Sequence, residues 1–174
     1  MTGYVAYVQY FCRFAIIITF FTSFTGKIRS IPKFEKAITD FDLTPQSLNR
    51  ILVFLFLLGE LVTVVLLFLG GIWSSLGFIL AITHLVLFSG ALILVIARNI
   101  QTSCNCFGSS EKTVSYYDVW RNGGLITCAS IGLATLNADL SLHLSIPEIG
   151  IIFLMTIPFV AVWIHLGDLI QLFR

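Results

Sequence analysis

The chain has 174 residues, of which 57% are hydrophobic and only 11% are charged, and its formal net charge is +1. Soluble domains carry roughly 25% charged residues, so the composition excludes a soluble globular fold and indicates a protein whose solvent is lipid. The small net charge gives no indication of nucleic acid or of an acidic partner. We therefore expect a single integral-membrane domain over residues 1–174.

Five apolar stretches are each long enough to cross a membrane, because a helix rises ~1.5 Å per residue across ~30 Å of hydrocarbon. They cover about residues 4–24, 51–70, 73–97, 123–140 and 148–173. A polar connection that contains Pro45 joins the first two, and Gly70 and Gly71 form a tight turn before the third. Ser145 and Glu148 have capping-box spacing at the start of the last. The prediction is an all-α polytopic bundle with a four-helix core and a C-terminal span.

Basic residues are concentrated at one end of this predicted bundle. With five spans, one side of the membrane holds Lys27, Arg29, Lys33, Lys36, Arg50, Arg98, Lys112, Arg121 and Arg174. Arg13 alone lies toward the other side. Because Lys and Arg in short loops favour the cytoplasm, the charge pattern predicts an external N-terminus and a cytoplasmic loop after the third span.

That loop, at about residues 98–121, contains Cys104 and Cys106 separated by one asparagine. A disulfide between them would close a small, strained ring, which is easy to reduce and therefore suited to thiol–disulfide exchange. A soft Cu(I) site and a cysteine pair without chemistry remain as alternatives. The chain has only two methionines, Met1 and Met155, to assist a Cu(I) carrier, which disfavours that alternative.

The other two cysteines lie within predicted spans. Cys12 is about two turns into the first span, and Cys128 is a similar depth into the fourth from the opposite face. Each is then ~9 Å from its own side of a ~30 Å core, which leaves roughly 12 Å between their levels. Disulfide Cα atoms lie within ~7 Å, so we expect no bridge between them. Cys128 would either relay electrons to Cys104 and Cys106 or act as a small hydrophobic residue.

Two ionisable side chains lie near the middle of neighbouring spans. Counted from the turn between the second and third spans, Glu60 and His84 differ in depth by only ~4 Å, so they are close enough to share a hydrogen bond. A carboxylate is costly in lipid and is expected to face the bundle interior. The two residues would handle protons or bind a quinone-like head group, or they would be a buried polar pair that fixes helix register.

Charged residues also mark the ends of the first and last spans. Lys27 and Arg29 leave the first span together, where they would meet lipid phosphates or a carboxylate, although snorkelling anchors are the commoner explanation. His165 and Asp168 are one turn apart and are expected to form a local pair. A metal site would need further ligands, so we predict no metal.

Three motifs occur in order: TGKIR after the first span, LGEL inside the second, and CNCFG after the third. Together they resemble the MauE family of redox-associated membrane proteins, which is related to DoxX, over about residues 8–140. The resemblance implies a protein that supports disulfide formation in, or transport of, the exported small subunit of methylamine dehydrogenase, alongside a thioredoxin-like partner. It implies that Cys104 and Cys106 are the redox pair, and that Lys27 and Glu60 are charged motif positions without an assigned role.

The functional hypothesis is a thiol–disulfide redox protein in a bacterial inner or plasma membrane. Its cysteine pair would exchange disulfides with a thioredoxin-fold partner and an exported client, and a quinone near Glu60 and His84 is the candidate electron carrier. The implied client is exported, which favours an external cysteine loop, whereas the charge pattern favours a cytoplasmic one. The alternative function is a non-enzymatic assembly or maturation partner whose cysteines are incidental.

Overall fold

The computed structural model describes residues 3–41, 45–100, 115–136 and 144–165. Within these ranges the chain forms six helices and no strand: α1 (Gly3–Arg29), α2 (Ile31–Asp40), α3 (Gln46–Leu69), α4 (Trp73–Ala97), α5 (Tyr116–Thr135) and α6 (Ile146–Ile164). The predicted all-α polytopic bundle is confirmed. The polar connection between the first two spans contains a helix of its own, α2, which packs Phe34 against Val53 and Leu57 of α3.

Among the described helices, α1, α3, α4 and α6 are long and apolar enough to cross a membrane. The fourth predicted span corresponds to α5, which begins at Tyr116 and not at Gly123. Its 20 residues suffice for ~30 Å, but Asp118 and Arg121 make its first turns polar. The crossing of the membrane by α5 therefore stays a prediction.

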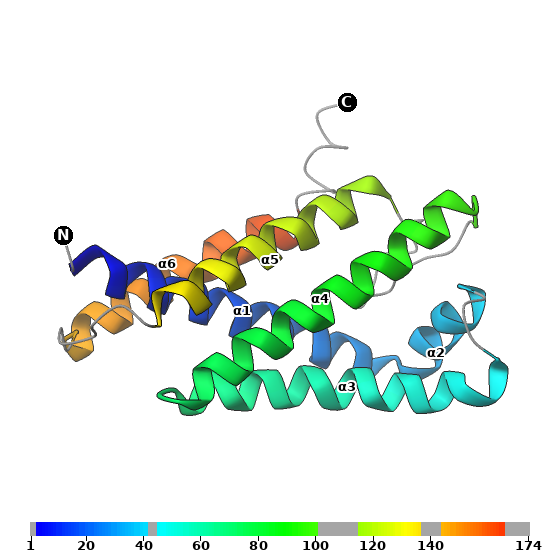
Figure 1. Cartoon of the computed structure of the whole chain (residues 1–174), viewed down its shortest axis with the longest axis horizontal. Helices are drawn as coiled ribbons and strands as arrows, with labels where there is room; N and C mark the ends of the chain where they lie inside the picture. Colours follow the sequence, from blue (N-terminus) through cyan, green and yellow to red (C-terminus); the bar gives the residue numbers. More distant parts are fainter. Residues whose placement is uncertain (1–2, 42–44, 101–114, 137–143, 166–174) are drawn as a thin grey trace.

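The helices run alternately up and down the bundle (Figure 1). α1, α4 and α6 run in one direction, α3 and α5 run back, and α2 lies at the end where α1 finishes. α1 packs against α3, α5 and α6, and α4 packs against α3 and α5. The main apolar core lies between these helices and includes Ile16, Phe20, Leu67, Phe78 and Leu125. The outer faces carry exposed large apolar side chains, as expected of a surface in contact with lipid.

The turn between α3 and α4 is held by an arginine from α1. Gly70 and Gly71 both have positive φ, of 76° and 55°, a conformation that glycine adopts without steric cost. The Arg13 guanidinium donates hydrogen bonds to the carbonyl oxygens of Leu67 and Phe68 in the last turn of α3. Carbonyl groups at a helix C-terminus lack intrahelical partners, so Arg13 satisfies them where the helix dipole is negative.

Candidate functional site

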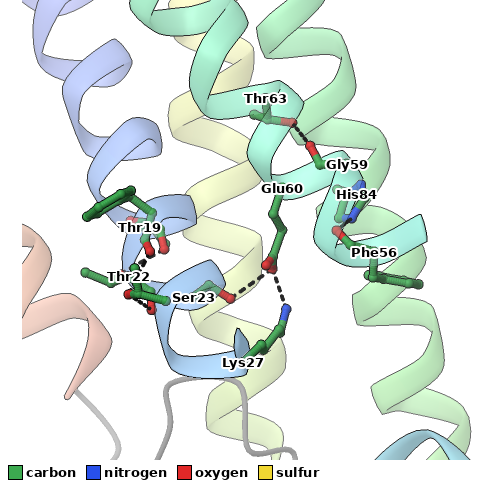
Figure 2. Close-up of polar contacts among 11 residues, drawn as sticks. Thr19, Thr22, Ser23, Lys27, Phe56, Gly59, Glu60, Thr63 and His84 are labelled. Atoms are coloured by element: carbon green, nitrogen blue, oxygen red, sulfur yellow. Dashed lines mark hydrogen bonds and ion pairs between the residues drawn. The ribbon is translucent and has the colours of Figure 1, made fainter. Parts of the chain in front are cut away.

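A buried ion pair joins α1 to α3. Lys27 Nζ contacts Glu60 Oε1, and the two residues are only 3% and 4% exposed. Ser23 Oγ donates a hydrogen bond of 2.9 Å to the same carboxylate oxygen. Ser23 and Lys27 are four residues apart, so they lie on one face of α1, and Figure 2 shows both pointing toward the Glu60 carboxylate. The commoner explanation of Lys27 as a snorkelling anchor is therefore wrong, because its ammonium faces the bundle interior.

Aromatic rings complete the environment of the Lys27 ammonium. Its Nζ lies 4.9 Å from the ring centroid of Phe34 and 5.6 Å from that of Phe88. Cation–π contacts of this kind strengthen when water is excluded. Arg29, which the sequence grouped with Lys27, is exposed, so the two basic residues have different surroundings.

His84 of α4 lies beside this ion pair but does not hydrogen-bond to Glu60 as its depth suggested. Its Nε2 lies 3.2 Å from the carbonyl oxygen of Phe56, one turn before Glu60 on α3. The imidazole reaches that carbonyl because Gly59 has no side chain: a Cβ there would lie 2.2 Å from His84 Cε1. The depth argument correctly predicted that His84 lies beside the turn of α3 that contains Glu60. It did not predict the hydrogen bond to the backbone, which the absence of a Cβ at Gly59 allows.

The ion pair and His84 border a pocket between four helices. The empty space amounts to ≈ 440 Å³, part of it open to the surroundings. The lining comprises Thr19, Phe20, Ser23 and Lys27 of α1, Phe56 and Glu60 of α3, His84, Leu85 and Phe88 of α4, and Arg121, Asn122 and Leu125 of α5. The pocket thus combines charged, amide and imidazole groups with aromatic walls, a composition typical of sites for small molecules with a polar ring.

Glu60 Oε2 and Asn122 Nδ2, an acceptor and a donor of the pocket lining, are buried without a hydrogen-bond partner in the described part of the chain. A buried polar atom without a partner costs about 1–3 kcal/mol, so such atoms indicate a place that water or a polar ligand satisfies. Asn122 was not among the residues predicted to form a site, because the predicted fourth span began at Gly123 and the cysteine loop was expected to precede it.

The expectation that Cys12 and Cys128 lie at different levels is wrong. Their thiols are neighbours between α1 and α5, and neither cysteine is in a disulfide. The depth argument failed because α5 begins at Tyr116, so Cys128 is ~18 Å along the helix and not ~9 Å. That additional length brings Cys128 level with Cys12 on the antiparallel α1.

The remaining predicted site residues are not brought together by the described part of the structure. Cys104, Cys106 and Asp168 lie outside the described residues, and a relay from Cys128 to the first two stays a prediction. His165 is exposed at the end of α6. Among the described residues, no three His, Cys, Asp or Glu side chains gather as a metal site would require.

Comparison with known protein families gives a match over most of the chain. A family model described as "Methylamine utilisation protein MauE" matches residues 5–135, which is more than half of the chain. The matched range contains most of α1 and all of α2, α3, α4 and α5, and it leaves α6 outside. All of the residues that line the pocket lie within it. Neither the curated proteins nor the solved structures yield a match.

Proposed function

The chain belongs to the MauE family of methylamine utilisation proteins, and we propose that it is a membrane-embedded thiol–disulfide redox protein. Cys104 and Cys106 alternate between dithiol and disulfide through mixed disulfides with a thioredoxin-fold partner. The final recipient of the disulfide is an exported client, the small subunit of methylamine dehydrogenase or a similar protein. The host membrane is the inner or plasma membrane of a bacterium.

The observation that carries this proposal is the polar pocket around Glu60. An oxidised thiol pair must be regenerated by an electron acceptor, and inside a membrane a quinone supplies that chemistry by taking up two electrons and two protons. The lining suits a quinone head group in its chemistry, because aromatic side chains border the pocket and the unpartnered Nδ2 of Asn122 can donate to a carbonyl oxygen. The free oxygen of the Glu60 carboxylate and the imidazole of His84 are available to exchange protons.

The pocket lies toward the end of the bundle at which α4 ends and α5 begins, which supports a role in accepting electrons from the cysteines between these two helices. Lys27 lies in the last turn of α1, and Arg121 and Asn122 lie in the second turn of α5. α4 ends and α5 begins at that same end of the bundle, where α1 meets α2 (Figure 1). The chain that carries Cys104 and Cys106 connects α4 to α5, so in sequence the motif directly precedes the pocket residues of α5.

Thiol trapping in intact cells tests the cysteine assignment. The protein carries Cys12→Ser and Cys128→Ser, so that only Cys104 and Cys106 react with a membrane-impermeant maleimide. We expect labelling only after mild reduction, and from outside, which also decides between the two predicted orientations of the loop. Free thiols that label without reductant, and only in opened cells, would contradict an exchangeable external disulfide.

The client provides the second readout. In separate strains that carry Cys104→Ser or Cys106→Ser, we expect the client to accumulate with free thiols while the membrane protein is present at its normal level. Normal client disulfides in both strains would refute the redox function.

The alternative is a non-enzymatic assembly partner, and the close packing at Gly59, Gly124 and Gly132 favours it. A Cβ at Gly124 would lie 2.1 Å from the Trp163 ring, and one at Gly132 would lie 2.5 Å from the Phe78 ring. Such tight contacts are typical of helix interfaces that fix one arrangement of a bundle. This function predicts normal client maturation in both serine variants, and its loss when Gly124 or Gly132 is enlarged.

A further inference from the structure

Two thiols meet within the helix bundle, away from the cysteine motif of the loop. Cys12 of α1 is 3% exposed, and Cys128 of α5 is partly buried. Their thiols lie next to each other across the α1–α5 interface, where the two helices pack together. A single buried cysteine is usually an inert hydrophobic residue, whereas two thiols in contact can be oxidised together.

A glycine brings the two helices close at this level. Gly132 is one turn beyond Cys128 on the same face of α5, and a Cβ there would lie 3.2 Å from Cys12 Cβ. The α5 backbone therefore approaches α1 closely beside the thiols. A disulfide requires Cα atoms about 4.4–6.8 Å apart, and this close helix approach favours such a separation.

The thiols also lie near the quinone-like pocket. Leu125 is the pocket residue of α5 farthest along the helix, and it is one turn, or ~4.5 Å of helix rise, before Cys128. Leu125 belongs to the same core cluster as Ile16, which lies one turn beyond Cys12 on α1. An electron acceptor that contacts Leu125 would thus lie about one turn of α5 from Cys128.

We propose that Cys12 and Cys128 are a second redox site, a dithiol within the bundle that a lipid-soluble quinone oxidises to a disulfide. Oxidation breaks two S–H bonds, forms one S–S bond between α1 and α5, and transfers two electrons and two protons to the quinone, which leaves as the quinol. The inference rests on the proposed function for the quinone as electron acceptor. It does not depend on Cys104 and Cys106.

Oxidation of this dithiol would also act on the pocket itself. α1 carries Ser23 and Lys27, and α5 carries Asn122, so a bond between these two helices holds opposite walls of the pocket at a fixed separation. The redox state of the dithiol is therefore coupled to the geometry of the site that receives its electrons.

The test counts free thiols in the Cys104→Ser/Cys106→Ser variant in native membrane vesicles. The quinone is a fully ring-substituted benzoquinone with a decyl tail, which cannot form a stable thioether with cysteine. After incubation, the protein is denatured and treated with a polyethylene-glycol maleimide, and the number of added chains is read from gel mobility. We expect two additions before oxidation, none after it, and two again after dithiothreitol.

The matched control carries an additional Cys12→Ser substitution and must keep its single addition throughout. Two additions that persist after quinone treatment overturn the inference, as does a loss that dithiothreitol does not reverse or a loss in the control. Oxidation by the permeant reagent diamide but not by the quinone overturns the assignment of the acceptor. Because this variant lacks the loop cysteines, failure here is separate from failure of client maturation.

Discussion

Lys27 and Glu60 form an ion pair between α1 and α3 in the interior of a bundle whose outer surface is apolar. Ser23 donates to the carboxylate oxygen that Lys27 contacts, and the second oxygen of Glu60 is buried without a protein partner in the described residues. The pair therefore joins two helices, and its carboxylate belongs to the pocket lining with one oxygen unsatisfied. A purely structural ion pair would be expected to have both of its carboxylate oxygens satisfied.

Removal of one member of this pair should be more harmful than removal of both. Lys27→Met or Glu60→Leu leaves an uncompensated buried charge, so we expect each to lower the free energy of unfolding by about 3–5 kcal/mol. The double variant should be more stable than the sum of the two effects predicts. Thermal unfolding in detergent, analysed as a double-mutant cycle, measures the coupling. Additive effects would show that the two side chains do not interact.

Gly59→Ala should displace the His84 imidazole, because the new Cβ would lie 2.2 Å from Cε1. Overpacking of this kind costs about 1–3 kcal/mol of stability. Gly90→Ala on α4 is the matched control, since nothing lies within 4 Å of a Cβ there, and it should leave stability unchanged or slightly raised. If the steric conflict is the cause, His84→Ala should relieve the defect of Gly59→Ala. A defect that persists in the double variant would point to a different cause.

Arg13→Met should destabilise the end of α3. The carbonyl oxygens of Leu67 and Phe68 lose their charged donor, and hydrogen bonds to charged groups contribute about 1.5–3 kcal/mol. Arg29→Met, which removes an exposed arginine at the other end of α1, serves as the control. We expect a lower unfolding temperature for Arg13→Met only. Equal unfolding temperatures for both variants would show that the Arg13 contacts contribute no stability.

Asn122→Leu should separate ligand binding from stability. It removes a buried Nδ2 that has no protein partner in the described chain, so the free energy of unfolding of the ligand-free protein should not fall. Binding of a photoreactive quinone analogue should weaken about tenfold, the equivalent of one hydrogen bond of ~1.4 kcal/mol. Ser130→Ala on the exposed face of α5 is the control. Unchanged labelling of Asn122→Leu would exclude the amide from quinone binding.

The apolar stretches predicted the helices well, because hydrophobic length is a direct requirement of a lipid environment. They also predicted that Glu60 faces inward, since a carboxylate has no other favourable place in such a chain. The start of α5 was missed because its first turns are polar: Ser115 and Asp118 cap the helix through a backbone N–H to carboxylate bond of 3.0 Å. Arg121 and Asn122 are buried against the pocket.

That single error in the start of α5 had two further consequences. Asn122 was not recognised as a residue of the bundle, and Cys128 was predicted to lie at a different depth from Cys12. Neither consequence was visible from composition, because both depend on how helices pack and not on how apolar they are. The hydrogen bond of His84 was missed for a related reason, since it requires the absence of a side chain at Gly59 on the facing helix.

The central position of α1 bears on how the protein is made. α1 is synthesised before α3, so it carries both Arg13 and Lys27 into the membrane before their partners on α3 exist. Glu60 follows Lys27 by 33 residues, and the carbonyl groups that receive Arg13 come at the end of α3. Charged side chains are unfavourable in lipid until they are paired. Insertion of α1 alone is therefore unfavourable, and pairing with α3 would remove that cost.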